Sequence, residues 1–458
     1  MGLLSSGDSN RPVTLRHVDV CVIFVVAVSI RLLLLKEVLE QIGLGPLWTL
    51  APDGVHYVDM AWDMVRGTDR ASYFLTTWPP GYPTFLALQM TIFGGASLVP
   101  LLVQILLSSA STILLYALAL QLTGRRLIAF LSGLLLALSS TSISLSVMLL
   151  SDTLFLFLFV GGFLLFVRAL KTGGWKYFIW SGLLTGNAIL VRAIGEFWPT
   201  VMLVVAALFA LSMTAAKSHT IHETRRSLMN KALVCIGIVV AIEGSWMVRN
   251  YCVHGKFFLT TVDSGGLANI AAFRCERSGG EFFRDVRAKW QESYAREHGL
   301  NKLPPEAMRE ADIQAAVETL QQHPGQFIEA YLALVWENLN AVNQTFRHLL
   351  PEHRSQAAEI EAYLQAYYLN YLAFALSALG FLALVFRRSY VAAMVLGLTF
   401  LYFALTIGVT RWQGSRLFLP GQVAALPLIS AAIASLLDLI RSAGKKMLHA
   451  LRLVSDSV

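Results

Sequence analysis

Long apolar runs restrict this chain more than any other feature of its sequence. A helix needs about 20 mostly apolar residues to cross the roughly 30 Å hydrocarbon core of a membrane, and about ten runs of this length are present. They cover residues 18–36, 97–122, 127–149, 152–170, 176–193, 195–214, 231–249, 367–386, 389–408 and 416–440. Only 14% of the residues are charged, whereas soluble domains carry about 25%. The runs therefore predict an all-α polytopic membrane protein with about ten transmembrane helices.

The basic residues between the runs predict which side of the membrane each loop faces. If the N-terminus is cytoplasmic, every loop on that side is basic, as the positive-inside rule requires. This topology accounts for the net charge of +7 without a nucleic-acid partner. We expect a plasma (inner) membrane protein with both termini in the cytoplasm. The expected parts are the N-terminus and first span (1–36), a first extracytoplasmic catalytic loop (37–96), a transmembrane bundle (97–249), a large extracytoplasmic loop with amphipathic helices (250–366), and the C-terminal spans with a cytoplasmic tail (367–458).

The first outer loop contains the segment "APDGVHYVDMAWDMVRG", residues 51–67. Pro52 can begin a short helix with Asp53 in its first turn, and Tyr57 then lies one turn further along the same face, beside His56. Two interpretations of Asp53 stay open: the helix dipole favours a carboxylate there, or the carboxylate is a general base for an acceptor hydroxyl. Further on, "PPGYP" surrounds Tyr82 with residues that fix the backbone, which suits either a membrane re-entry turn or a rigid site.

Several charged residues break the positive-inside pattern. Arg192, Arg249, Arg411 and Arg416 fall at the outer ends of spans, where each either reaches lipid headgroups or contributes to a phosphate site. Asp152 begins the run after "VMLLS", and it either caps a helix or orients a substrate.

Most familiar catalytic signatures are absent from the sequence, including Walker A, the Gly-rich dinucleotide fingerprint, HExxH, CxxC and Asp-x-Asp. A cytoplasmic nucleotide substrate is therefore not expected. A divalent metal stays open, because Asp53, Asp152 and His56 offer oxygen and nitrogen ligands. Cys252 and Cys275 both fall in the large outer loop, so a disulfide between them is a hypothesis.

The order of these motifs resembles the GT-C glycosyltransferases. Asp-x-x-x-Tyr after the first run is followed by Pro-Pro-Gly-Tyr-Pro and then by Ser-Asp-x-Leu. Further matches are "SWMVRNYCVHGKF", "HPGQFIEAYL" and "SRLFLPGQVAAL". The resemblance is greatest to the bacterial and archaeal relatives of protein O-mannosyltransferases and of the lipid A aminoarabinose transferase, and it extends over nearly the whole chain.

This resemblance implies an inverting transfer of a sugar from a polyprenyl-phosphate carrier to an acceptor outside the cytoplasm, without a required cofactor. The acceptor is a hydroxyl of a glycan, glycolipid or protein, and membrane lipids surround the enzyme. Asp53 takes the place of the family's catalytic aspartate, and Arg249 and Arg416 match basic positions near the carrier phosphate. The other residues expected to bind substrate are His56, Tyr57, Tyr82, Asp152, Arg192, Asn250 and Arg411. The chain departs from the family pattern at Gly54, Ser245 and Leu417, which leaves sugar and acceptor open.

Three other functions remain as alternatives. A transporter or flippase of lipid-linked sugar tends to place its charges near the bilayer midplane and to be built from repeats, and neither feature is visible in the sequence. A non-catalytic scaffold would not need Asp53. An enzyme that uses a pyrophosphate-linked oligosaccharide is the alternative among transferases, but the Trp-Trp-Asp signature of oligosaccharyltransferases is missing.

Overall fold

The computed structural model is helical throughout its described part, which comprises residues 15–48, 50–68, 77–95, 97–213, 219–260, 262–277, 280, 282–301, 303–343, 349, 355–410 and 413–455. No strand occurs in these residues. Eight helices within them are long and apolar enough to cross a membrane, or nine if one bent pair counts as a single span. The predicted all-α, multi-pass integral membrane protein is thus confirmed, with fewer long spans than the ten expected.

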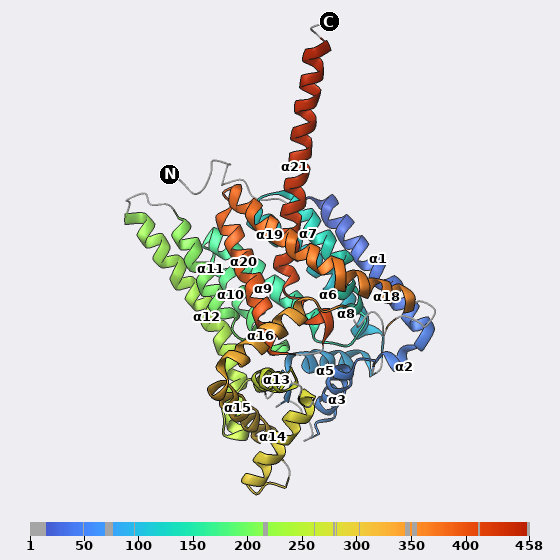
Figure 1. Cartoon of the computed structure of the whole chain (residues 1–458), viewed down its shortest axis with the longest axis vertical. Helices are drawn as coiled ribbons and strands as arrows, with labels where there is room; N and C mark the ends of the chain where they lie inside the picture. The colour runs from blue at the N-terminus through green and yellow to red at the C-terminus, as the bar shows by residue number, and fades with distance from the viewer. Residues whose placement is uncertain are drawn as a thin grey trace.

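Most of the helices form a bundle that occupies most of Figure 1. They are α1 (His17–Ile42), α6 (Val99–Thr123), α7 (Arg126–Leu138), α8 (Ser140–Ser146), α9 (Asp152–Thr172), α10 (Trp175–Val191), α11 (Trp198–Ser212), α12 (His219–His254), α19 (Asn370–Phe386), α20 (Tyr390–Thr406) and α21 (Gln422–Ser455). Other helices are α2 (Leu44–Leu47), α16 (Pro324–Leu339) and α18 (Ser355–Leu364), which a π-helix (Gln365–Leu369) joins to α19.

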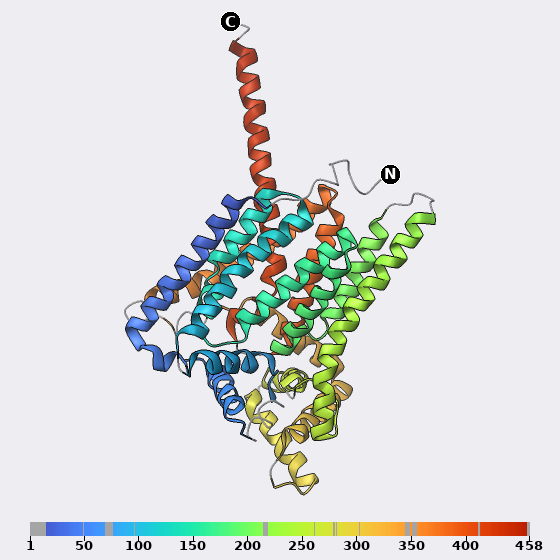
Figure 2. The same cartoon turned by 180° about the vertical axis from the view of Figure 1, so that it is seen from behind.

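Five further helices gather at one end of this bundle, which we call the loop end (Figures 1 and 2). They are α3 (Pro52–Arg66), α5 (Gly81–Phe93), α13 (Val262–Arg277), α14 (Phe283–Glu297) and α15 (Pro305–Gln322). α1 starts at the opposite end, and α21 ends there as a single helix that projects beyond the bundle (Figure 2). α3 and α5 of one predicted outer loop and α13, α14 and α15 of the other therefore lie at the same end of the molecule.

α9 runs through the middle of the bundle and is packed by aromatic side chains. The ring of Phe159 on α9 lies 4.8 Å from that of Trp198 and 5.1 Å from that of Phe403, both in edge-to-face contact. All three side chains are buried. Each such edge-to-face pair stabilises the fold by about 0.5–1.5 kcal/mol beyond the contribution of burying the rings. This packing holds the N-terminus of α9, which begins with Asp152, in a fixed place at the loop end.

The predicted span 127–149 is not one straight helix, and this corrects the sequence expectation. α7 and α8 meet at an angle of 53°, and the Ser139 side chain caps α8 by accepting a hydrogen bond from the Ser142 backbone N–H. Arg31 of α1 is fully buried beside the break. It donates to the carbonyl of Ala137 and to the hydroxyls of Ser108 and Ser142. A polar cluster in the bundle therefore replaces the helical hydrogen bonds that the break removes.

Other boundaries also differ from the predicted runs. The predicted run 176–193 corresponds to α10, which has 17 residues and ends at Val191, two residues earlier than predicted. The run 416–440 becomes helical at Gln422, after a short 3-10 helix over Gly414–Phe418. Cys252 and Cys275 are free thiols, so the suggested disulfide is not formed.

Candidate active site

Asp53 lies in the first turn of α3, as the sequence predicts. Ala51 is extended, Pro52 opens the helix, and the Asp53 carboxylate follows at the positive end of the helix dipole. Its side chain is 24% exposed, and its Oδ2 lies 2.7 Å from Nη1 of Arg416. Asp53 is therefore an ion-paired carboxylate with one side open to the loop end.

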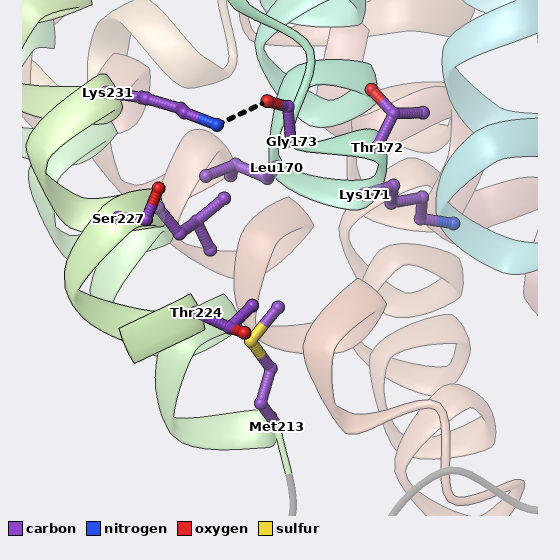
Figure 3. A pocket seen from close by; sticks show the side chains of 9 residues that line it. Leu170, Lys171, Thr172, Gly173, Met213, Thr224, Ser227 and Lys231 are labelled. Carbon is purple, nitrogen blue, oxygen red and sulfur yellow. Dashed lines mark hydrogen bonds between the residues drawn. The ribbon is translucent and has the colours of Figure 1, made fainter. Parts of the chain in front are cut away.

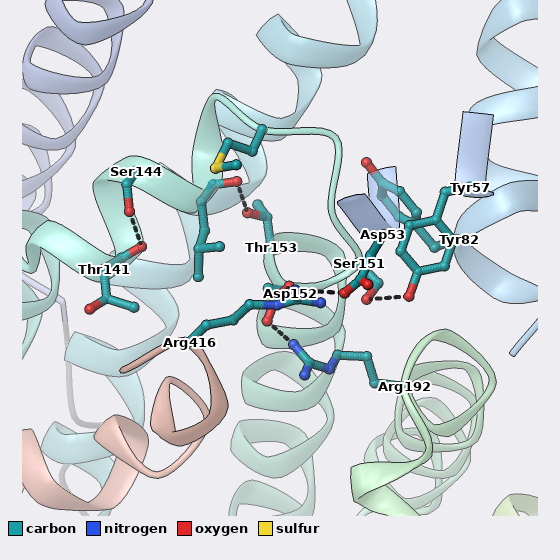
Figure 4. A network of polar contacts seen from close by, with 12 residues as sticks. Asp53, Tyr57, Tyr82, Thr141, Ser144, Ser151, Asp152, Thr153, Arg192 and Arg416 are labelled. Atoms are coloured by element: carbon teal, nitrogen blue, oxygen red, sulfur yellow. Dashed lines mark hydrogen bonds and ion pairs between the residues drawn. The ribbon is translucent and has the colours of Figure 1, made fainter. Parts of the chain in front are cut away.

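Asp152 connects this pair to a second arginine. Its side chain is only 1% exposed, and its Oδ2 accepts a hydrogen bond from Nε of Arg416 at 2.9 Å. Its other oxygen forms an ion pair with Arg192. Figure 4 shows the four side chains pointing toward one another from four separate segments of the chain. We call Asp53, Arg416, Asp152 and Arg192 the four-charge network.

The backbone explains how both arginines reach the carboxylates. Arg192 ends α10 in an extended conformation, and Arg416 lies in the 3-10 helix before α21. Both side chains are only 11% exposed. A charge buried to this degree is costly unless it is paired, and the two arginines and two aspartates balance one another. The network is neutral as a whole, and each member depends on its partners.

Tyr57 and Tyr82 form one wall of the site. The Tyr57 hydroxyl lies 3.3 Å from that of Ser151, next to Asp152, and its ring meets that of Tyr82 edge-to-face at 5.0 Å. The Tyr82 hydroxyl donates to Gln104 at 2.6 Å. Burial raises the pKa of Tyr57, partly offset by the positive charge of Arg416, and it raises the pKa of Tyr82 well above its ordinary value. Both phenols are therefore neutral hydrogen-bonding groups near pH 7.

Two glycines next to the predicted residues allow close backbone approaches. A Cβ at Gly81 would come within 2.8 Å of the Leu190 carbonyl, so the Pro-Pro-Gly-Tyr-Pro turn packs against the end of α10 just before Arg192. A Cβ at Gly54 would lie 3.1 Å from the Leu149 carbonyl. This close packing gives a physical reason for glycine at position 54.

Trp78 is part of the site but was not anticipated from the sequence. Its ring lies 5.5 Å from that of Tyr57 and 6.3 Å from that of His56, which is exposed. The signal that would have identified it is its position directly before the proline turn. His56 therefore lies beside an aromatic group at the open edge of the site.

The contacts of Asn250 and Arg249 do not include the four-charge network. Asn250 is fully buried and donates to the carbonyls of Phe258 and Leu259 at 2.9 and 3.0 Å. Arg249 donates to the Asn250 side-chain oxygen and stacks over Trp246. These contacts hold the turn at the end of α12. Arg411 lies outside the described residues.

The carboxylates do not form a typical metal site. Within the part of the chain that the structure describes, no group of three or more His, Cys, Asp or Glu side chains is placed to hold a metal ion. Asp53 and Asp152 are instead joined by the guanidinium of Arg416.

The arrangement of the helices is similar to that in known structures. The structure is similar to the archaeal oligosaccharyltransferase AglB from Archaeoglobus fulgidus in complex with an inhibitory peptide and a dolichol-phosphate, with a TM-score of 0.53 and 14% identity over 96% of this chain and 52% of that one. It is also similar to the Archaeoglobus fulgidus oligosaccharyltransferase complex with Zn and sulfate, with a TM-score of 0.51. The identity is 13%, over 94% of this chain and 51% of that one. The chain spans about half the length of these proteins. The likeness confirms the GT-C fold predicted from the sequence.

Part of the sequence also matches a known protein family. Residues 77–246 match the family of dolichyl-phosphate-mannose-protein mannosyltransferases. No curated protein matches the chain. The family match and the fold together confirm the resemblance to GT-C glycosyltransferases. The long apolar helices are those of an integral membrane protein.

Proposed function

We propose that this chain is an inverting glycosyltransferase that moves a sugar from a polyprenyl-phosphate carrier to an acceptor hydroxyl on the extracytoplasmic side of the membrane. The observation that carries the proposal is the four-charge network at the loop end, in which Asp53 is the more exposed carboxylate. The match of residues 77–246 to dolichyl-phosphate-mannose-protein mannosyltransferases supports the same chemistry.

In the proposed reaction the acceptor oxygen attacks the anomeric carbon of the donor sugar. The bond from that carbon to the phosphate oxygen breaks, and its electron pair leaves with the phosphate. Asp53 accepts the proton of the attacking hydroxyl, which typically contributes roughly 10²–10⁴ in rate. Attack from the face opposite the leaving group inverts the configuration of the sugar.

Arg416 links donor binding to the base. Its guanidinium now donates to Asp53 and Asp152, and the same planar donors match a phosphate. A carrier phosphate can accept the hydrogen bond that Arg416 now donates to Asp53. The Asp53 carboxylate then loses its ion pair. A carboxylate without a cationic partner is a stronger base. Binding of the lipid-linked sugar therefore prepares Asp53 to accept the proton of the acceptor hydroxyl.

Asp152 acts as a positioning residue in this scheme. It is nearly inaccessible and holds both Arg192 and Arg416. Guanidinium groups fixed before the reaction stabilise the negative charge that develops on the leaving phosphate without further rearrangement. A polyprenyl monophosphate carries less charge than a pyrophosphate, so two arginines suit it.

The charge of the loops supports the extracytoplasmic side for this reaction. The loop end carries Asp53, whereas the opposite end carries the pairs Arg125–Arg126 and Arg387–Arg388. Under the positive-inside rule the basic end is cytoplasmic. Transport is the less favoured function, because the charges of the proposed site gather at one end of the bundle. Arg31, the buried charge within α1, is held by hydrogen bonds at the α7–α8 break.

The proposal is tested with the purified chain in lipid nanodiscs. Radiolabelled polyprenyl-phosphate sugars are offered with a panel of glycan, glycolipid and peptide acceptors, and the label is followed from the lipid to the aqueous or acceptor-lipid fraction. Transfer of label with inverted anomeric configuration supports the proposal. Movement of intact lipid-linked sugar across a vesicle bilayer without cleavage would contradict it and favour the flippase.

A further inference from the structure

A pocket lies at the end of the bundle opposite the four-charge network. It has a volume of about 420 Å³ and is formed by the turn between α9 and α10 and by the first part of α12. Its lining residues are Leu170, Lys171, Thr172, Gly173, Met213, Thr224, Ser227, Leu228 and Lys231 (Figure 3). α9 has 21 residues and runs from Asp152 to Thr172, so at about 1.5 Å per residue the pocket and the network are about 30 Å apart. The pocket is thus not part of the proposed active site.

The chemistry of the lining favours an anionic group. None of the nine lining residues is acidic, and two are lysines. Nζ of Lys231 donates to the carbonyl of Gly173 at 2.8 Å, which is a neutral partner, and a lysine ammonium carries three donors. Ser227 lies on the same side of the pocket as Lys231 (Figure 3). Lys171 extends away from Lys231 and donates to the Gln121 carbonyl of α6, so Lys231 is the cation that faces the pocket.

Further positive charges surround the same turn. Arg168 and Lys176 both lie over the ring of Tyr177, at 4.7 and 5.1 Å. Trp175 lies under Lys231 at 5.5 Å. Aromatic rings beside basic side chains are typical of the border between lipid headgroups and hydrocarbon. The pocket therefore opens where the headgroups of the surrounding lipids would lie.

Apolar side chains on the neighbouring helices indicate that the anion has a hydrocarbon tail. Leu211 at the end of α11 is 70% exposed, and Leu233 on α12 is 50% exposed. The pocket itself is lined on one side by Leu170, Met213 and Leu228. These apolar side chains adjoin the hydrocarbon of the membrane. The acyl chains of a phospholipid can therefore lie along them while its phosphate enters the pocket, which is a contact that a soluble phosphate cannot make.

We infer that this pocket binds the phosphate-bearing headgroup of an anionic phospholipid, with Lys231 and Ser227 as donors and the acyl chains along α11 and α12. Basic pockets between transmembrane helices bind anionic headgroups in this way. The bound lipid joins the α9–α10 turn to α12. Because α9 begins with Asp152 and α10 ends at Arg192, the lipid braces the helix pair that carries half of the four-charge network at its far end.

Native mass spectrometry of the purified chain, with dioleoyl phosphatidylglycerol or dioleoyl phosphatidylcholine added, tests the inference. The chain should retain phosphatidylglycerol in preference to phosphatidylcholine, and it should unfold at a higher temperature with the anionic lipid. Lys231→Met should weaken phosphatidylglycerol binding about tenfold or more, which corresponds to about 1.4 kcal/mol. Lys446→Met, which removes the same charge from the exposed, projecting part of α21, should bind like the unchanged chain.

A second variant separates binding from folding, because Lys231 also caps the end of α9. Ser227→Leu keeps both lysines and fills the pocket, so it should lose phosphatidylglycerol while unfolding at the usual temperature in phosphatidylcholine. Equal retention of the two lipids by the unchanged chain would overturn the inference, as would normal phosphatidylglycerol retention by both pocket variants. Displacement of the lipid by equimolar glycerol 1-phosphate would overturn the choice of a lipid and assign the pocket to a soluble phosphate.

Discussion

Replacing Asp152 by asparagine tests how the four-charge network is held together. The substitution keeps the size of the side chain but removes the charge that binds both Arg192 and Arg416. Two guanidinium groups that are 11% exposed then share one remaining carboxylate. Loss of one partner from a buried ion pair costs about 3–5 kcal/mol. At about 2 °C per kcal/mol for a large domain, the unfolding temperature should fall by about 6–10 °C.

The assay is thermal unfolding of the purified chain in one detergent, followed by tryptophan fluorescence. Asp59→Asn is the matched control, because Asp59 lies exposed on α3, and its unfolding temperature should stay unchanged. The double variant Asp152→Asn with Arg192→Met removes one charge of each sign and should recover part of the lost stability. The reasoning is refuted if Asp152→Asn unfolds at the same temperature as the unchanged chain. It is also refuted if the double variant loses as much stability as the two single variants added together.

Two further predictions concern the scaffold of the site, and both are measured as unfolding temperatures in the same detergent. Arg31→Met should lower the free energy of unfolding by about 3 kcal/mol or more, because the buried hydrogen-bond acceptors at the α7–α8 break lose their donor. Lys36→Met, on the exposed side of α1, is the control and should have little effect. Gly81→Ala should cost about 1–3 kcal/mol through its clash with the end of α10, whereas Gly237→Ala, with nothing within 4 Å, should be neutral or stabilising. Equal effects of target and control in either pair would contradict the packing described above.

The sequence predicted the elements that follow from local pattern. Long apolar runs marked the bundle, and Pro52 marked the start of α3 and so placed Asp53 in its first turn. Asp152, Arg192 and Arg416 were identified as exceptions to the charge pattern, which is a local signal of each span end. The structure shows in addition that they form one network with Asp53. Arg416 is 264 residues from Asp152 and 363 residues from Asp53 along the chain.

The features that the sequence did not predict depend on contacts between distant segments. Arg31 lies inside an apolar run, and its serine partners are 77 and 111 residues away. The break at Ser139 is stabilised by that arginine, so the apolar pattern of 127–149 does not reveal it. Trp78 gains its role only when α3 and α5 lie side by side and bring its ring against Tyr57.

The measurement that tests the central claim most directly is sugar transfer by the Asp53→Asn variant, with carrier binding measured on the same preparation. Asparagine keeps the shape of the side chain but cannot accept the acceptor's proton, so turnover should fall by roughly 10²–10⁴. Carrier affinity should stay equal or increase, because Arg416 loses its ion pair with Asp53 and is free for the phosphate. Asp59→Asn, on the same helix, should keep its activity. Full transfer activity in Asp53→Asn, or loss of carrier binding with it, would contradict the assignment of Asp53 as the base.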